Sequence, residues 1–417
     1  MANQGRYCTG DGFVENLAVG PGVKITSITP SSQNVSGRKV HGAVVNAGIE
    51  NDGEQGTDSL VTPTPPNVWY DDQKNKDPGN TGVPLLFPAG TEGSILKAVS
   101  NLSPEPNQGR NRLVYGSALT VCAVSPPANA FRPGLAALSK VSKWTADMLP
   151  DPDTLRKLPV PTSMPSLNGI IARQRWLLQS WITSNDAGWQ QTPTSNHNGY
   201  GSDFSIDTAN AICALSLDID LNAKTQLMRL MSQRGVDEFE KLEVGGNFNN
   251  GGGGHSGKGL HMTVAAHLLN DSAMKAYLGI PNPNARFVED MQYVTVTSDM
   301  VASHGYPPGD FGGPEWNINP DQYWVSPPNP STTAPYRQVN LRWQLGASVG
   351  IQLLGARATR NNENFFNYVD RITFRTFNNG SGPFAWAMSE SIASSFHKSM
   401  VSDHRSAAGM PAIWNWS

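Results

Sequence analysis

The feature that most constrains this chain is a run of glycines between two stretches of helical periodicity. It lies within residues 233–270, QRGVDEFEKLEVGGNFNNGGGGHSGKGLHMTVAAHLLN, with six glycines between Gly245 and Gly254. Glycine loses more conformational freedom on folding than any other residue, so such a run is unfavourable unless the backbone turns through positive φ or passes close to something. A flexible surface loop is the simplest interpretation. A histidine and a lysine at the mouth of the next helix, His255 and Lys258, favour a functional loop.

Length and composition limit the class of protein. The chain has 417 residues, a length typical of roughly two or three domains. Its formal net charge is -3 and 16% of residues are charged, so neither a nucleic-acid partner nor an acidic tail is indicated. Abundant glycine and proline favour long ordered loops and β-structure. The three cysteines, Cys8, Cys122 and Cys213, form no disulfide framework or metal-binding spacing, although Cys8 and Cys122 could pair.

Hydropathy and composition bear on where the protein works. No apolar segment follows Met1, and no apolar run is long enough for a membrane span, so we expect neither an ordinary signal peptide nor a spanning helix. Low charge with abundant Asn, Ser, Thr and Gly is more typical of an exported or virion protein than of a cytoplasmic enzyme. We therefore expect an extracellular or virion-associated location, with the cytoplasm left open. The sequence also leaves open whether the protein forms a homo-oligomer.

The N-terminal third has the pattern of β-structure. Apolar and polar residues alternate with the period of a half-buried strand, and Pro/Gly turns separate the segments. The predicted strands are residues 23–28, 38–45, 94–100 and 112–124. They predict a β-sandwich-like domain over residues 1–125. The prolines of residues 126–165 predict a linker.

From Ser166 the period changes to that of helices. The predicted helices cover residues 167–182, 205–217, a segment capped by Asn222 that reaches Phe239, and residues 257–269, 338–359, 362–376 and 384–400. Successive helices joined by long polar loops indicate antiparallel pairs stacked around an axis. We therefore predict a multidomain α+β fold, with an (α/α) partial-toroid helical domain over residues 166–417.

Three polar loops interrupt the helical region, at residues 189–203, 245–258 and 303–324. Loops this long in a compact domain are usually functional or disordered. If alternate loops emerge on one face, the three share a groove. Their mixture of aromatic, amide and histidine side chains suits sugar binding, because aromatic faces stack on pyranose rings and amides bond hydroxyls or carboxylates.

The residue types in these loops fit β-elimination on a uronic acid. A histidine and a tyrosine can remove the proton next to a carboxylate and protonate the leaving oxygen. We predict Tyr200 and His255 as the acid/base pair, with His197 as a further catalytic candidate. An amide or a cation must also neutralise the substrate carboxylate. The predicted substrate-binding residues are Asn196, Asn247, Lys258, Trp189, Tyr306 and Trp316.

Simpler interpretations and other chemistries compete with this one. His197 could be a solvated loop histidine, and Tyr200 could be a packing residue. Residues 252–259 nearly match a phosphate-binding loop, but the final hydroxyl is replaced by Gly259 and the preceding segment is helical, which disfavours nucleotide binding. The histidine spacing fits no zinc motif, so no metal or cofactor is predicted. A paired-carboxylate glycosidase stays open through Asp203, Asp310 and Glu315.

Several blocks of the chain carry a resemblance. They are FRPGLAALSK (131–140), YGSDFSIDTANAICALSLDID (200–220), QRGVDEFEKLEVGGNFNNGGGGHSGKG (233–259) and ENFFNYVDRITF (363–374). These blocks resemble a family of uncharacterised bacterial and phage-associated proteins that pair an N-terminal β region with a helical domain. The similarity covers much of the chain from Arg132 onward.

The helical domain also resembles the α/α-toroid polysaccharide lyases of the alginate-lyase and heparinase type. That resemblance implies a cleft lined by Asn, His, Tyr and Arg. The positions of this chain that match are Asn196, His197, Tyr200 and His255. There are fewer predicted helices than a complete toroid needs, so a partial toroid is expected.

Two hypotheses about function follow. The first is a carbohydrate-active protein, a polysaccharide lyase that cleaves an acidic polysaccharide by β-elimination. The second is a non-catalytic structural or glycan-binding protein of a virion, fibre or cell surface. The expected partner is an acidic polysaccharide or a surface glycan in either case.

Overall fold

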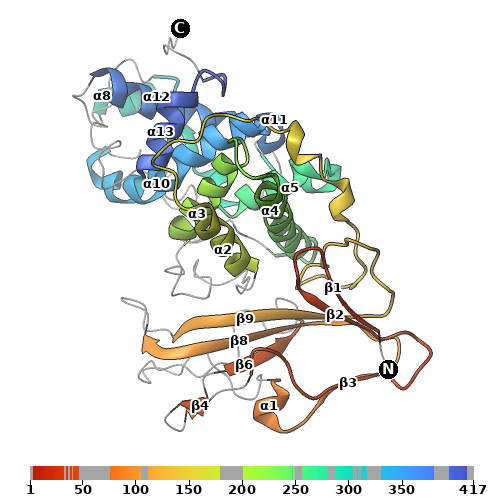
Figure 1. The fold of residues 1–417 in the computed structure, drawn as a ribbon. Helices are drawn as coiled ribbons and strands as arrows, with labels where there is room; N and C mark the ends of the chain where they lie inside the picture. The colour runs from red at the N-terminus through yellow and green to blue at the C-terminus, as the bar shows by residue number, and fades with distance from the viewer. Residues whose placement is uncertain are drawn as a thin grey trace. The chain divides into compact units, whose positions relative to one another are not determined.

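The chain combines helices with β-sheets, a mixed α+β class as the sequence predicts (Figure 1). The computed structural model describes residues 3–31, 34–35, 38–39, 41–46, 76–104, 111–178, 201–246, 248, 256–279, 287–303, 308, 311–316, 330–379 and 394–410.

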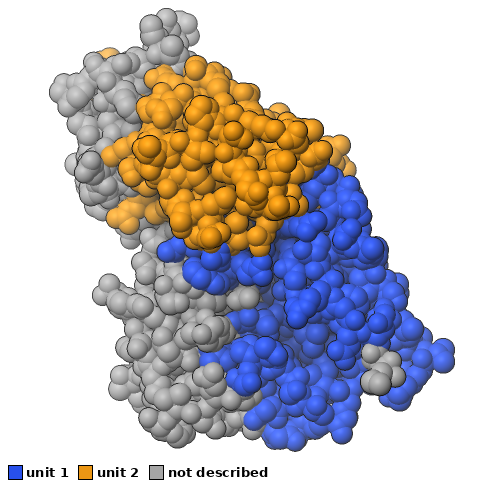
Figure 2. Space-filling model, viewed as in Figure 1, with its two compact units in different colours: residues 1–150, 172–199, 228–247 blue, residues 151–171, 200–227, 248–417 orange. Residues whose placement is uncertain are grey.

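The chain divides into two compact units, and each takes residues from several parts of the sequence (Figure 2). Unit 1 comprises residues 1–150, 172–199 and 228–247, and unit 2 comprises residues 151–171, 200–227 and 248–417. The predicted ranges 1–125, 126–165 and 166–417 follow the order of the sequence instead, and as independent domains they stay a prediction.

Unit 1 is built on a five-stranded sheet. Its strands, in spatial order, are β1 (Gln4–Arg6), β2 (Gly12–Glu15), β9 (Asn111–Cys122), β8 (Gly93–Pro104) and β6 (His41–Val45). The pair β2–β9 is parallel and the other neighbours are antiparallel. The predicted strands at 94–100 and 112–124 are thus confirmed in β8 and β9, whereas the range 38–45 holds two strands of different sheets, β5 (Arg38–Lys39) and β6.

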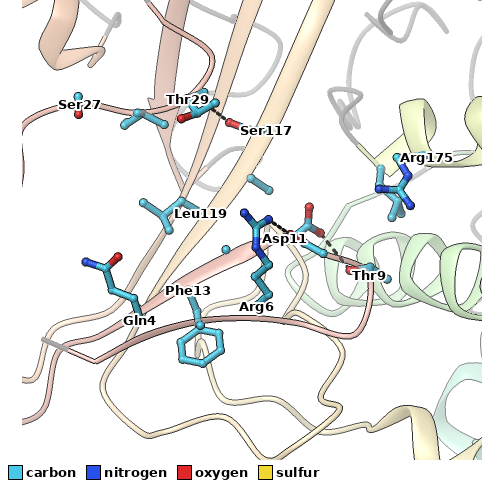
Figure 3. Close-up of a pocket in the computed structure, with 16 residues that line it drawn as sticks. Gln4, Arg6, Thr9, Asp11, Phe13, Ser27, Thr29, Ser117, Leu119 and Arg175 are labelled. Atoms are coloured by element: carbon cyan, nitrogen blue, oxygen red, sulfur yellow. Dashed lines mark hydrogen bonds between the residues drawn. The ribbon is translucent and has the colours of Figure 1, made fainter.

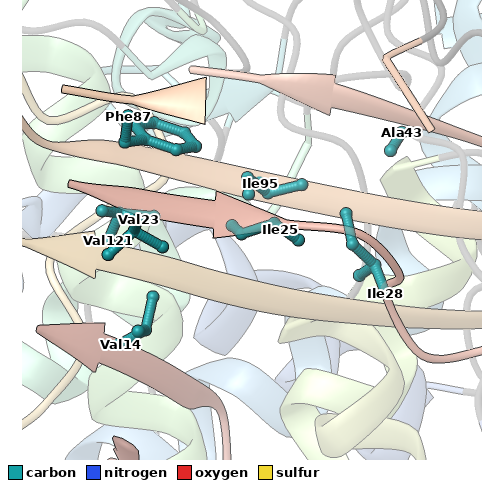
Figure 4. Packing of buried hydrophobic residues seen from close by; sticks show 8 residues of the cluster. All are labelled: Val14, Val23, Ile25, Ile28, Ala43, Phe87, Ile95 and Val121. Atoms are coloured by element: carbon teal, nitrogen blue, oxygen red, sulfur yellow. The ribbon is translucent and has the colours of Figure 1, made fainter. Parts of the chain in front are cut away.

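A second pair of strands packs on this sheet. β3 (Val23–Ile25) pairs antiparallel with β7 (Leu85–Phe87). Val23 and Ile25 are buried while Lys24 is exposed, which is the alternation that predicted this strand. One buried apolar cluster joins both layers (Figure 4); its members are Val14, Val23, Ile25, Ile28, Ala43, Phe87, Ile95 and Val121. The shorter elements are β4 (Asn34–Val35), β5 (Arg38–Lys39) and α1 (Pro78–Thr81).

A buried arginine ties the segment after β9 to helix α4 (Leu221–Glu243) within unit 1. Arg132 is fully buried, and its Nη1 and Nη2 donate to the two carboxylate oxygens of Asp237, each at 2.7 Å. Its Nε donates to Asp11 Oδ2 at 3.0 Å. The Gln233 amide bonds the backbone N–H and carbonyl of Arg132, both at 2.8 Å. The start of the predicted proline-rich linker is therefore anchored in unit 1.

Unit 2 is mostly helical. Its elements are α3 (Gly201–Ala214), α5 (Gly259–Leu268), α6 (Ser272–Lys275), α7 (Val288–Met291), α8 (Ser298–Ser303), α10 (Pro330–Leu354), α11 (Arg357–Arg360), α12 (Glu363–Asn379) and α13 (Ser395–His404), with β10 (Tyr293–Thr295) antiparallel to β11 (Pro314–Trp316). Helix α10 packs against α3, α12 and α13. Helices α2 (Leu167–Leu178) and α4 carry residues of both units.

Two details of the predicted helices are wrong. The helix predicted over 338–359 is two helices, because Gly355 adopts φ 80° and ends α10 after Leu354. Asn222 is not the cap of α4. The helix begins at Leu221, and Asp220 Oδ1 accepts from the N–H of Ala223 at 2.9 Å.

The three cysteines are free thiols. The Sγ of Cys122 lies 3.1 Å from the Tyr7 hydroxyl within unit 1. Burial raises the pKa of Cys122 to about 11 and that of Cys8 to about 12, and it raises the pKa of Cys213 too. Among the described residues, no helix is both long and apolar enough to cross a membrane.

Candidate functional site

The described ends of two of the predicted polar loops meet in unit 2. The residue after Tyr200 begins helix α3, and Ser205 on that helix donates a hydrogen bond to the carbonyl oxygen of Ser256 at 2.7 Å. Ser256 directly follows His255 in the chain. The two segments that carry the predicted acid/base pair are therefore joined by a buried hydrogen bond close to those residues in sequence.

A series of contacts connects Ser256 to the third predicted polar loop, at residues 303–324. Ser256 Oγ donates to Asn340 Oδ1 at 2.6 Å, and Trp343 Nε1 donates to the same oxygen at 3.3 Å. The Trp343 ring stacks on Phe365, with centroids 6.1 Å apart, and Phe365 makes an edge contact with Tyr293 at 6.0 Å. Tyr293 begins β10, whose partner β11 comes from the loop at 303–324.

Gly257, three residues after the glycine run, is a position that requires glycine. Its φ is 77°, a conformation that side chains disfavour. A Cβ at this position would overlap the hydroxyl oxygen of Ser205. Gly257 therefore needs to be glycine for two reasons: its positive φ and the close approach of Ser205 on α3.

A buried acid caps the helix that follows the glycine-rich stretch. The N–H of Gly259, the first residue of α5, donates to Glu289 Oε1 at 2.8 Å. A carboxylate at a helix N-terminus is favoured by the helix dipole. Glu289 is 1% exposed, and its burial raises its pKa to about 7, although Arg360 acts to lower it. This carboxyl group can therefore exchange a proton near neutral pH.

A buried ion pair and a buried amide lie beside this acid. Arg360 Nη2 lies 2.5 Å from Asp290 Oδ1, and Asn362 Nδ2 donates to the same oxygen at 3.0 Å. Asn362 also donates to the carbonyl of Glu289 at 3.2 Å. Helix α7 is thus attached to the segment around α11 by a buried ion pair and by two hydrogen bonds from the Asn362 amide.

Two predicted substrate-binding residues lie within the described residues, and both are buried. Lys258 is 1% exposed, and its Nζ lies 5.0 Å from the centroid of the Phe248 ring, itself stacked on Phe287. Trp316 is fully buried, and its Nε1 donates to Gln292 Oε1 at 3.1 Å. Their direct contact with a sugar stays a prediction.

The other predicted site residues lie outside the described residues. These are Tyr200, His255, His197, Asn196, Asn247, Trp189 and Tyr306. Among the carboxylates of the glycosidase alternative, Asp310 lies outside them too, and nothing is described of the Asp203 side chain. Glu315 is buried and accepts from Arg371 Nη2 at 2.9 Å.

Sequence reasoning missed Glu289. It lies in Val288–Met291, a single helical turn that matches no sequence motif. An acid followed by a second acid, Asp290, before an apolar strand was the only signal available. In the part of the chain that the structure describes, no group of three His, Cys, Asp or Glu residues is arranged to hold a metal ion.

Comparisons of the chain with protein-family models, with curated proteins and with solved structures gave no match. The similarity to the bacterial and phage-associated family and to the α/α-toroid lyases therefore stays a prediction. Any statement about function must rest on this chain's own residues.

Proposed function

We propose that this protein is a polysaccharide lyase that cleaves an acidic polysaccharide by β-elimination, with its catalytic residues in unit 2. The single observation that carries the proposal is the hydrogen bond from Ser205 to the carbonyl of Ser256. It joins helix α3, five residues beyond Tyr200, to the residue that follows His255. It does so beside a buried acid whose pKa lies near neutral pH.

The reaction requires a base, an acid and a group that neutralises the substrate carboxylate. The base removes the proton on the carbon next to the carboxylate, and a carbon–carbon double bond forms as the bond to the glycosidic oxygen breaks. The acid protonates that oxygen. Tyr200 and His255 form this pair, with His197 as the further candidate. Asn196 and Asn247 neutralise the carboxylate.

The buried groups act by positioning and by charge. Glu289 holds the first N–H of α5 and so positions the backbone that leads back to His255. Lys258, three residues beyond His255, adds a positive charge in a buried setting, where charges act more strongly than in water. Of the aromatic candidates, Trp189 and Tyr306 stack on sugar rings, and Trp316 supports the loop that carries Tyr306.

We also propose the finer fold assignments, a β-sandwich-like part in unit 1 and a partial α/α toroid in unit 2. The packing of β3 and β7 against the five-stranded sheet supports the first. The packing of α10 against α3, α12 and α13 supports the second. The low charge and polar composition support an extracellular or virion-associated location.

The test is the absorbance of the unsaturated uronate product. Wild-type protein is incubated with a panel of alginates, pectates and glycosaminoglycans, and an absorbance rise is expected with one of them. His255→Ala and Tyr200→Phe should each abolish that rise. His267→Gln is the matched control, because His267 lies on α5 and its Nδ1 is 3.3 Å from the hydroxyl of Thr359, a contact that glutamine can replace.

Wild-type rates in both His255→Ala and Tyr200→Phe would contradict the mechanism. No rise with any polymer, together with assembly of the protein into large particles or fibres, would favour the non-catalytic structural or glycan-binding alternative. Size-exclusion chromatography with light scattering measures that assembly on the same samples.

A further inference from the structure

Unit 1 contains a cavity of about 680 Å³ beside the β1–β2 hairpin (Figure 3). Its lining comes from the hairpin, from β9, from residues 27–29 and from the C-terminal part of α2. All of these belong to unit 1. The volume falls within the roughly 300–1,000 Å³ of small-molecule sites, which holds a few sugar rings.

The strand register explains why space remains there. In the β1–β2 pair, Arg6 lies opposite Gly12, which in turn pairs with Leu119 of β9. Residues opposite one another point to the same face of a sheet. Gly12 has no side chain, and a Cβ there would lie 3.3 Å from Leu119 Cδ1. The floor of the cavity is thus bare backbone and the apolar side chain of Leu119, while the ring of Phe13 points to the opposite face (Figure 3).

The charges around the cavity favour an anion. Arg6 is exposed, and one of its nitrogens, Nη1, donates to the carbonyl of Gly10 at 2.8 Å. Arg175 on α2 is exposed as well, and among the described residues neither arginine forms an ion pair. The one lining carboxylate, Asp11, is engaged by the Nε of buried Arg132 at 3.0 Å. Two guanidinium groups therefore face the cavity with donors available.

We propose that this cavity binds a uronate residue of an acidic oligosaccharide, at a site separate from the proposed cleavage site. A guanidinium group matches a carboxylate with two parallel hydrogen bonds. Arg6 and Arg175 bind the carboxylate, and Gln4 and Thr29 bond the sugar hydroxyls. The apolar face of the ring lies over Leu119. The choice of a sugar acid over other anions rests on the proposed function.

Isothermal titration of the full chain with an alginate tetrasaccharide tests the proposal. His255→Ala serves as the background, so that cleavage does not consume the ligand. Arg6→Gln and Arg175→Gln should each weaken the binding at one site about tenfold, the loss expected for a charged hydrogen bond. Lys24→Gln is the matched control, because Lys24 is an exposed cation of unit 1 on β3, away from the cavity. It should leave the affinity unchanged.

Unchanged affinity in both arginine variants overturns the proposal, and so does an equal loss in Lys24→Gln. Competition by inorganic sulfate as strong as that by galacturonate overturns the choice of a sugar acid. The two proposals fail in different ways. Cleavage of a polymer together with arginine-independent binding contradicts the cavity site alone. Arginine-dependent binding without cleavage of any polymer contradicts the lyase alone.

Discussion

Gly257 makes the meeting of the glycine-rich stretch with α3 possible. Alanine there would be strained by φ 77° and would displace Ser205, whose Oγ occupies the place of the added methyl group. The hydrogen bond to Ser256 would be lost with it. We predict that Gly257→Ala lowers the free energy of unfolding by about 3 kcal/mol, measured by urea denaturation.

The matched control is Gly245→Ala. Gly245 has a similar φ of 86°, but no atom lies within 4 Å of the place that an alanine Cβ would take. Only the backbone strain remains, so the expected loss is about 1 kcal/mol. Equal losses in the two variants would show that close approach to Ser205 contributes nothing.

Glu289 makes stability depend on pH. Burial raises its pKa from 4.5 to about 7, so between these values the folded protein holds a proton that the unfolded chain has released. Stability therefore falls as pH rises through this window and is level above it. Glu289→Gln keeps an oxygen for the Gly259 N–H. We predict that it is more stable than wild type at pH 8, by up to roughly 3 kcal/mol, and equal at pH 4.

Denaturant midpoints measured from pH 4 to pH 8 check this prediction. Asp370→Asn is a useful companion, because burial raises the pKa of Asp370 from 3.8 to about 7. Asp370→Asn should also be more stable than wild type at pH 8, and it leaves the contacts of α5 unchanged. If neither variant gains stability relative to wild type between pH 5 and pH 8, the assignment of these two groups is wrong.

At the level of single residues, the sequence predicts types of chemistry better than positions. The glycine-rich stretch and His255 stand out in any pattern search, whereas Glu289 owes its properties to burial, which depends on distant segments. Lys258 and Trp316 lie on polar loops in the sequence, but both are buried, and they contact Phe248 and Gln292, which are distant from them in the chain. The burial of a loop residue depends on tertiary packing, so it cannot be predicted from the local sequence pattern.

At the level of elements, helix α4 carries a carboxylate, Asp237, that is fully buried. Asp237 neutralises the buried guanidinium of Arg132. Burial acts to lower the pKa of Arg132, but Asp237 and Asp11 raise it, so it stays charged. We predict that Asp237→Ala costs about 3–5 kcal/mol, because the two Nη atoms of the buried guanidinium lose their carboxylate and only Nε stays paired with one, that of Asp11. Urea denaturation measures the loss.

Glu243→Ala on the same helix is the control. Glu243 pairs with Lys143, whose side chain is 46% exposed, so the expected loss is below about 1 kcal/mol. The double replacement Arg132→Met with Asp237→Leu should recover most of the stability. A loss in Asp237→Ala no larger than that in Glu243→Ala would refute the role of the buried pair.

Strands and helices were largely predictable because their periods are local. The alternation around Lys24 and the two strand-like segments at 94–100 and 112–124 predicted β3, β8 and β9. The break at Gly355 was missed because apolar residues continue the helical spacing on both sides of it. The parallel pairing of β2 with β9 could not be predicted, since Phe13 and Thr120 lie far apart in the chain and nothing local specifies the register.

At the level of the whole molecule, neither unit is one continuous segment. Residues 1–150 hold the sheet and Arg132, while Asp237 and Gln233 arrive later in the chain. We predict that a fragment of residues 1–150 lacks cooperative unfolding, whereas residues 1–246, which add α2 and α4, regain it. Thermal unfolding followed by circular dichroism compares the two. A sharp transition in the shorter fragment would contradict the prediction.

The free cysteines give each unit its own chemical reporter. Cys122 belongs to unit 1 and Cys213 to unit 2, and both are completely enclosed. The thiolate is the form of cysteine that attacks an alkylating reagent, and burial suppresses the thiolate in both side chains. Each thiol therefore reacts only after the unit around it unfolds. The order in which Cys122 and Cys213 are alkylated thus gives the order in which the two units unfold, and no label has to be introduced.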